Sequence, residues 1–309
     1  MSTPLISVII PLYNKEREIG DTLRSVLAQT LQPAEIIVVN DGSTDRSAEI
    51  VREIASPLVK LITQPNAGEC AARNRAIAET TGEYIALLDA DDVWKPEFLE
   101  EIAAMIAEFP DCGVYATAFD IVGHDGIFPA RTPSNRGVVD DFFRDSAHQY
   151  IAIPSASAIP RKVFDHVGGF PEGMKIGGDM YMWIKIARHY KVCFSPKRLV
   201  NYSRVASNRS ASSYTPEQTA YSFETLYDPL ASESEREFIA RAALGKALIL
   251  SAKGDTEAAM RAIRTFSYTK TYRRTWRKVR VLNALPPKWR GPVIGLYNRL
   301  AWAIARKGL

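Results

Sequence analysis

The sequence has few of the residues that mark several protein classes. Its 309 residues include only three cysteines, Cys70, Cys112 and Cys193, without CxxC spacing, and four histidines without metal-ligand spacing. These absences exclude a disulfide scaffold and a zinc site built from cysteine or histidine. No apolar run reaches the roughly 18 residues that cross a bilayer, and the N-terminus shows no basic targeting region. We therefore expect a cytoplasmic globular protein with reduced thiols.

Acidic residues are absent from the C-terminal end. Between Ala258 and Leu309 there are thirteen Lys and Arg residues and no Asp or Glu. Because the whole chain carries a net charge of +4, residues 1–257 carry −9. The basic end therefore predicts an anionic partner. Hydrophobic residues make up 46% and charged residues 24% of the chain, which excludes wholesale disorder.

The first half of the chain alternates short β-branched runs with segments of helical periodicity. This alternation is typical of a mostly parallel sheet with helices on both faces. We expect strands at 6–10, 36–39, 59–63 and 84–88, and helices at 16–29, 44–55, 68–79 and 96–108. After residue 207 the strand pattern stops, and we expect helices at 217–226, 233–252 and 256–266. The sequence thus predicts an α/β domain over 1–207 and a helical region over 208–309.

Polar residues follow each of the four expected strands. They are Pro11 with Tyr13, then Asp41, then Asn66, and then Asp89-Ala90-Asp91-Asp92. Ligands of such sheets bind beyond the carboxyl ends of the strands, so these residues could converge on one polar ligand. At any single strand end an ordinary turn explains the residues equally well. The fourth end differs, because one turn does not need three carboxylates within four residues.

The acidic cluster of Asp89, Asp91 and Asp92 indicates a metal site. Neighbouring carboxylates repel one another unless a cation or hydrogen-bond donors neutralise them. Their oxygens suit Mg²⁺ or Mn²⁺, which usually keep open positions for phosphate oxygens. The cluster therefore predicts a diphosphate–metal site, and the alternative is a solvated acidic turn in which Asp91 or Asp92 caps the next helix.

Four motifs in residues 5–110 are similar to those of family 2 glycosyltransferases. They are Ser7-Val-Ile-Ile-Pro-Leu-Tyr-Asn14, Ile37-Val-Val-Asn-Asp-Gly-Ser-Thr-Asp45, Asn66-x-Gly68 with Ala72-Arg-Asn74, and Gly82-Glu-Tyr-Ile-Ala-Leu-Leu-Asp-Ala-Asp-Asp92. Each motif alone is modest support, but their order and spacing are specific. The resemblance implies an inverting enzyme with a GT-A fold, in which 1–207 is the catalytic domain that binds a nucleotide-sugar.

The resemblance also implies roles for individual residues in binding a UDP-sugar. Pro11 and Tyr13 would frame the base and ribose, Asp41 would accept a hydrogen bond from uracil, and Arg73 would contact the base or its neighbourhood. Asn66 would also belong to the nucleotide-sugar site. Asp89 and Asp91 would hold the ribose and diphosphate, and Asp91 or Asp92 would bind the Mn²⁺ or Mg²⁺. A packed Tyr13, a turn-forming Asp41 and an exposed helical Arg73 remain the alternatives.

Two later segments resemble the family more loosely. Asp179 stands where the family carries its general base, but Gly178 replaces the usual preceding Glu, and an N-cap role for Asp179 is the alternative. Arg204 aligns with an arginine near the diphosphate, although Ser203 and Ala206 replace the usual Tyr and His. A surface arginine explains Arg204 about as well.

The resemblance predicts transfer of a sugar from a UDP-sugar to a saccharide or lipid-linked saccharide, in cell-envelope polysaccharide or glycolipid synthesis. The alternative is a catalytically impaired relative that binds at membranes, which the departures at Gly178 and Ala206 favour. Nucleotidyl transfer has less support, since no Gly-rich triphosphate loop is present near the N-terminus.

Residues 270–309 combine basic residues, aromatic residues and an amphipathic pattern. Such segments suit the anionic surface of a membrane, here the inner face of the cytoplasmic membrane. A helical cap on the catalytic domain is the alternative. Nucleic acid is not expected as a partner, because no recognised nucleic-acid-binding motif accompanies the basic residues. The sequence does not indicate an oligomeric state.

Overall fold

The computed structural model describes residues 3–207 and 219–295. The chain forms two compact units, Met1–Ser213 and Tyr214–Leu309. The expected division at residue 207 therefore falls a few residues before the end of the first unit. The two units are described separately below.

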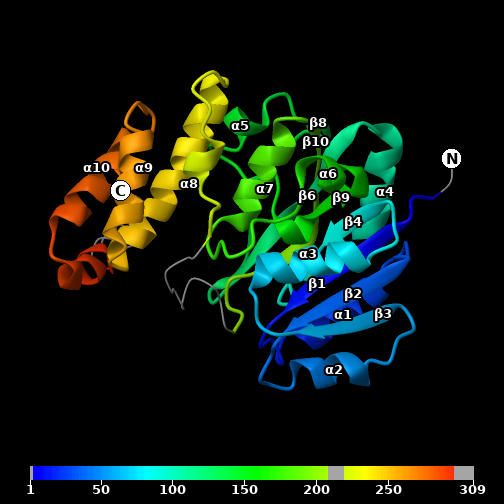
Figure 1. Ribbon diagram of the computed structural model, residues 1–309. Coiled ribbons are helices and arrows are strands. Elements are labelled where there is room, and N and C mark those ends of the chain that lie inside the picture. The colour runs from blue at the N-terminus through cyan, green and yellow to red at the C-terminus, as the bar shows by residue number, and fades with distance from the viewer. Residues whose placement is uncertain (1–2, 208–218, 296–309) are drawn as a thin grey trace. The chain divides into compact units, whose positions relative to one another are not determined.

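The first unit is built on one mixed sheet (Figure 1). Within the described residues its strand order is β3-β2-β1-β4-β9-β6-β10-β5, with β7 beside β6 and β8 beside β10. The expected parallel arrangement is confirmed for β1 to β4, whereas β9 runs antiparallel to β4 and β6. The strands are β1 (Ile6–Leu12), β2 (Glu35–Asp41), β3 (Val59–Gln64), β4 (Tyr84–Leu87), β5 (Val93–Trp94), β6 (Cys112–Gly123), β7 (Gly126–Pro129), β8 (Gly137–Val138), β9 (Ser157–Pro160) and β10 (Lys191–Ser203).

Helices connect most of these strands, as the periodicity predicted. They are α1 (Ile19–Leu27), α2 (Ser47–Glu53), α3 (Glu69–Glu79), α4 (Phe98–Glu108), α5 (Phe142–Asp145), α6 (Arg161–Val167) and α7 (Gly178–Ala187), with a short 3₁₀ helix η1 (Pro154–Ala156). The structure differs from the expectations in two details. Helix α4, expected from residue 96, begins at Phe98 after Glu97 as its N-cap, and the β6–β7 hairpin was not among the expected elements.

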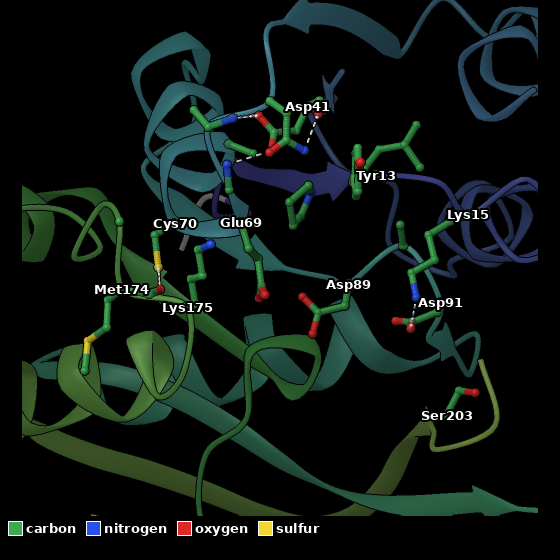
Figure 2. Close-up of a pocket in the computed structure, with 18 of the residues that line it drawn as sticks. Tyr13, Lys15, Asp41, Glu69, Cys70, Asp89, Asp91, Met174, Lys175 and Ser203 are labelled. Atoms are coloured by element: carbon green, nitrogen blue, oxygen red, sulfur yellow. Dashed lines mark hydrogen bonds and ion pairs between the residues drawn. The ribbon is translucent and has the colours of Figure 1, made fainter. Parts of the chain in front are cut away.

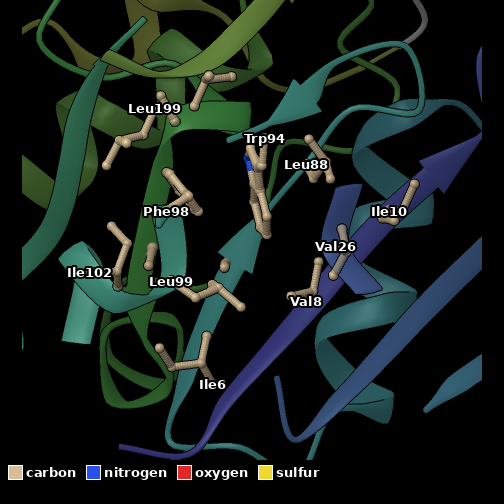
Figure 3. Packing of buried hydrophobic residues seen from close by; sticks show 14 of the residues in the cluster. Ile6, Val8, Ile10, Val26, Leu88, Trp94, Phe98, Leu99, Ile102 and Leu199 are labelled. Carbon is tan, nitrogen blue, oxygen red and sulfur yellow. The ribbon is translucent and has the colours of Figure 1, made fainter. Parts of the chain in front are cut away.

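The core of the first unit includes Leu88, Ala90 and Trp94, which flank or separate the residues of the predicted acidic cluster. Figure 3 shows Val8 and Ile10 of β1 in the same buried cluster as Trp94 and Phe98. The rings of Trp94 and Phe98 stack with their centroids 4.1 Å apart. The indole Nε1 of Trp94 donates to the backbone oxygen of Ser155 at 2.6 Å, and the Ser155 hydroxyl accepts from the backbone N–H of Asp89 at 3.1 Å. The core therefore fixes the segment that carries the acidic residues.

The second unit is helical in its described residues, as predicted. It contains the 3₁₀ helix η2 (Phe223–Leu226), α8 (Glu233–Ala252), α9 (Thr256–Thr265) and α10 (Arg273–Ala284). The expected α-helix over 217–226 is wrong for the described part, where only η2 forms. No helix in residues 3–207 or 219–295 is long and apolar enough to cross a bilayer.

The amphipathic pattern of the basic tail is partly explained by packing within this second unit. The apolar residues Trp276, Val279 and Leu282 of α10 are buried, and α10 contacts α8 and α9. The opposite face of α10 exposes its basic residues, while the expected apolar stripe continues into residues 296–309, which lie outside the described part of the chain.

Candidate active site

A cavity of about 550 Å³ opens at the carboxyl ends of β1, β2 and β4. This position agrees with the general rule for ligand sites in such sheets. Figure 2 shows labelled side chains from segments far apart in the sequence, among them Tyr13, Asp41 and Asp89, around the cavity. Six of the predicted site residues line it, namely Pro11, Tyr13, Asp41, Asn66, Asp89 and Asp91.

Asp41 joins the end of β2 to the loop before α3. Its carboxylate accepts hydrogen bonds from the backbone N–H groups of Ala67 at 2.9 Å and Gly68 at 2.8 Å, and from the Gln64 amide at 2.8 Å. Gly42, with φ +74°, permits the close approach of this loop, because a Cβ there would lie 2.9 Å from the Asn66 backbone nitrogen. Asp41 therefore shapes the cavity wall in addition to lining it.

Arg73 is buried beneath the cavity and holds two carboxylates. The guanidinium is 2% exposed, and its Nη2 contacts Glu69 and lies 2.6 Å from Asp89 Oδ1. Burial opposes its charge, but Glu69 and Asp89 raise the pKa of Arg73, so it remains a cation. The alternative of an exposed helical arginine is therefore wrong, and Arg73 supports the site from within α3.

Lys15 and Asp91 form a second ion pair at the cavity, with 2.8 Å between Lys15 Nζ and Asp91 Oδ2. Lys15 Nζ also donates to the backbone oxygen of Ser207. Burial and the charge of Asp89 raise the pKa of Asp91, and the Lys15 ammonium opposes that shift. The pair keeps a cation next to the acidic segment where an anionic ligand could bind.

Asp92 lies away from the cavity, unlike its neighbours Asp89 and Asp91. Its side chain is fully buried, and its Oδ1 accepts from the backbone N–H of Ser203 at 2.7 Å. Burial and the charges of Asp89 and Asp91 raise the pKa of Asp92 well above its usual value. In the described structure Asp92 therefore fixes the end of β10 beside the cavity, a role that the motif did not predict.

Asp179 lies in the first turn of α7, one residue inside the helix. The N-cap is Gly177, so the alternative that Asp179 is the cap residue is wrong. Burial raises the pKa of Asp179, and the negative charge of Asp89 raises it further. A hydrogen bond from the Met180 N–H and the positive charge of Arg73 lower it. Asp179 is not among the residues that line the cavity.

The space next to Asp179 explains why no glutamate precedes it. A Cβ on Gly178 would lie 2.5 Å from Cys70 Sγ, closer than real Cβ contacts. The thiol itself is held near the Met174 carbonyl, with 3.7 Å between Sγ and the oxygen. Burial raises the pKa of Cys70 to about 12, so the thiol is protonated at neutral pH and is no nucleophile. Cys70 thus occupies the space that a side chain at position 178 would need.

Arg204 is not brought to the cavity in the described structure. It is exposed, and its Nη2 contacts the Tyr150 hydroxyl at 3.4 Å. Several residues that the sequence did not identify do line the cavity, including Lys15, Glu69, Lys175 and Ser203. Lys15 and Glu69 lie directly after quoted motifs, so their place in the sequence could have indicated a role in the site. The directions of their side chains depend on the fold.

The residues present fit a divalent cation only if a ligand completes its coordination. No group of three or more His, Cys, Asp or Glu side chains that could hold a metal ion occurs in the described ranges. Asp91 offers hard oxygen ligands next to the cavity, and Mg²⁺ typically binds through one or two carboxylates together with substrate phosphates. The donor set is therefore suited to an ion that arrives with a diphosphate.

Comparisons with known proteins agree with this geometry. The family described as Glycosyl transferase family 2 matches residues 7–168, slightly more than half of the chain. The uncharacterized glycosyltransferase YibD of Escherichia coli (strain K12) is 46% identical over 109 residues, which cover 35% of this chain and 32% of that protein. A putative teichuronic acid biosynthesis glycosyltransferase, TuaG of Bacillus subtilis (strain 168), is 36% identical over 126 residues, or 40% of this chain and 50% of that one. These matches span between a third and a half of the relatives' lengths.

The solved structure of S. aureus TarS 1-349 in complex with UDP-GlcNAc superimposes with a TM-score of 0.61. The match has 23% sequence identity and covers 89% of this chain and 79% of that one. At this identity the likeness concerns the fold, and it confirms the GT-A architecture that the motifs implied.

We predict that Gly178→Ala destabilises the protein through its contact with Cys70. Overpacking should lower the free energy of unfolding by about 1–3 kcal/mol, and the same change should cost less in a Cys70→Ala background, which lacks Sγ. Urea denaturation of the wild type, both single variants and the double variant measures this coupling. Gly245→Ala in α8 is the matched control, because nothing lies within 4 Å of the added Cβ. Equal costs of Gly178→Ala in both backgrounds would refute the explanation.

Proposed function

The chain belongs to glycosyl transferase family 2, and on this premise we propose that it transfers a sugar from a UDP-sugar to a hydroxyl group of a saccharide or lipid-linked saccharide, with inversion at the anomeric carbon. The observation that supports this proposal is the convergence of strand-end residues on one cavity. There Asp89 and Asp91 lie next to two separate basic groups, Arg73 and Lys15. This arrangement suits a ligand with ribose hydroxyls and a diphosphate.

The nucleotide would enter at the β1–β2 side of the cavity. Tyr13, 39% exposed, offers an aromatic face, and Pro11 and Asn66 lie in the same lining. Oδ2 of Asp41 accepts one hydrogen bond, from the Gly68 N–H. This oxygen can therefore accept a second hydrogen bond, from a uracil N–H. Asp89 would accept from the ribose hydroxyls, while its other contact, with Arg73, fixes its orientation.

The diphosphate would lie on the side of Lys15 and Asp91. Mn²⁺ or Mg²⁺, when bound there through Asp91, would neutralise negative charge that develops on the leaving diphosphate. We propose Lys15, rather than the exposed Arg204, as the protein cation in contact with the diphosphate, because Lys15 lines the cavity. Its ammonium group adds a charge-assisted hydrogen bond to a phosphate oxygen.

Asp179 would act as the general base. Its carboxylate takes the proton of the acceptor hydroxyl, the oxygen forms a bond to the anomeric carbon, and the bond from that carbon to the diphosphate oxygen breaks with its electron pair. Attack from the face opposite the leaving group inverts the configuration. Burial raises the pKa of Asp179, which makes its carboxylate a stronger base than that of an exposed aspartate.

We expect Asp179→Asn to lower kcat/KM for sugar transfer by roughly 10²–10⁴-fold while the affinity for UDP stays unchanged. Because the base must be ionised, wild-type activity should be lost as the pH falls through the raised pKa, at a pH above the usual aspartate value of 3.8. UDP release from a panel of UDP-sugars with Mn²⁺ measures both effects, with the exposed Asp165→Asn as control. Full activity of Asp179→Asn would exclude this base, and absence of UDP release by the wild type would favour the impaired, membrane-binding alternative.

Asp91 and Asp92 are predicted to differ in metal binding. Mn²⁺ should strengthen UDP binding in the wild type and in Asp92→Asn, because the Asp92 carboxylate is buried against Ser203. In Asp91→Asn the Mn²⁺-dependent gain should be lost, since the cavity-lining carboxylate is replaced by an amide. Titration calorimetry with UDP, with and without Mn²⁺, compares the variants. If both variants lose the Mn²⁺-dependent gain in UDP affinity equally, Asp92 also binds the metal.

The acceptor is proposed from the relatives and from the basic surface of α10. A teichuronic acid glycosyltransferase among the relatives supports a role in cell-envelope polysaccharide or glycolipid synthesis. Helix α10 buries Trp276 and Val279 and exposes Arg274, Arg277 and Lys278, so contact with an anionic membrane would be mainly electrostatic. Such contact would bring the enzyme to the surface that carries a lipid-linked acceptor.

We predict that Arg274→Gln combined with Arg277→Gln weakens binding to vesicles of anionic lipid by roughly 30-fold, at about 1 kcal/mol per charge. Co-sedimentation at two salt concentrations measures this, and high salt should reduce wild-type binding. The control variant, Arg24→Gln with Arg46→Gln, removes the same charge from exposed positions of the first unit. If both variants bind as the wild type does, α10 is not a membrane surface.

A further inference from the structure

Glu69 is a carboxylate in the cavity for which the motifs predicted no role. It is the first residue of α3 and follows Gly68, whose φ of +92° turns the chain into the helix. Asp41 fixes this entry by accepting the Gly68 N–H at 2.8 Å. The Glu69 side chain is 49% exposed and lines the cavity, so a bound ligand can reach it.

The negative charge around Glu69 is only partly neutralised. Arg73 contacts both Glu69 and Asp89, and its buried Nε has no hydrogen-bond partner among the described residues. Arg73 lowers the pKa of Glu69, but partial burial and the charges of Asp89, Asp179 and Asp91 raise it above the usual value. Among the described residues Arg73 is the cation that pairs with Glu69, and Glu69 shares it with Asp89.

The two ends of the acidic segment therefore differ in charge. Asp91 is paired with Lys15, and in Figure 2 Asp89 lies between that pair and Glu69. A diphosphate is favoured beside Lys15 and disfavoured beside Glu69, because like charges repel. If the diphosphate lies at Lys15, the part of the cavity beside Glu69 remains for the sugar whose anomeric carbon reacts.

We propose that Glu69 determines sugar specificity: its carboxylate accepts hydrogen bonds from hydroxyl groups of the donor sugar and repels a sugar that carries a carboxylate. The proposal rests on the proposed function and adds the substrate class, a neutral hexose or N-acetylhexosamine rather than a uronic acid. Discrimination by an added repulsive group is a general means of specificity. Arg73 is the positioning residue that holds Glu69 in place.

Binding measurements without acceptor test this inference directly. Titration calorimetry with Mn²⁺ compares UDP, UDP-glucose, UDP-galactose, UDP-GlcNAc and UDP-glucuronic acid on the full chain. The wild type should bind at least one neutral UDP-sugar more tightly than UDP-glucuronic acid. Glu69→Gln should lower the affinity for that neutral donor about tenfold, which corresponds to the loss of one hydrogen bond to a charged group. The same change should increase the affinity for UDP-glucuronic acid, because the amide removes the repulsion. The affinity for UDP should change by no more than about twofold, because the nucleotide binds elsewhere in the cavity.

Opposite changes for neutral and acidic donors cannot arise from a general loosening of the site. Glu79→Gln is the matched control, because Glu79 lies on the same helix and pairs with Lys60 and Arg75 away from the cavity lining. Equal weakening of UDP and all UDP-sugars by Glu69→Gln, or no change for any of them, would overturn the assignment while leaving the proposed function intact. A wild type that binds no UDP or UDP-sugar would overturn both.

Discussion

The candidate site depends on the buried ion pairs of Arg73. This guanidinium lies almost without solvent between Glu69, at the start of α3, and Asp89, after β4. Two carboxylates from separate elements would repel each other across that space, and a buried cation without partners would be costly. The two ion pairs hold the N-terminus of α3 and the end of β4 at a fixed distance from each other. Glu69 and Asp89, at these two positions, both line the cavity.

The polar residues at the strand ends have structural contacts as well as open atoms. Asp41 holds the loop of residues 66–68, and Asp92 holds the end of β10 through Ser203. Because buried polar groups must be hydrogen-bonded, the chain uses some motif carboxylates to join its segments. Asp89 and Asp91 retain carboxylates that line the cavity, so three acidic residues within four positions have two different roles.

The packing of α10 limits how the basic C-terminal segment can interact with a membrane surface. The apolar side of α10 is covered by α8 and α9, which leaves the arginines on the outer side exposed. A helix whose apolar face is already buried interacts with a surface through charge instead of insertion. The sequence pattern alone allowed a membrane surface or a cap on the catalytic domain. The described structure shows that α10 packs one face on α8 and α9 of its own unit and exposes basic residues on the other.

The sequence by itself determined the strand–helix order, the parallel β1–β4 core and the strand ends that carry Asp41, Asn66 and Asp89, because periodicity and turn residues are local properties. Only the tertiary structure decided that Arg73 is buried, that Asp92 turns away from the cavity, that Cys70 fills the space beside Gly178, and that Lys15 and Glu69 face the ligand space. Those outcomes depend on which side chains from distant segments meet, and no local pattern encodes the direction of a side chain in a packed interior.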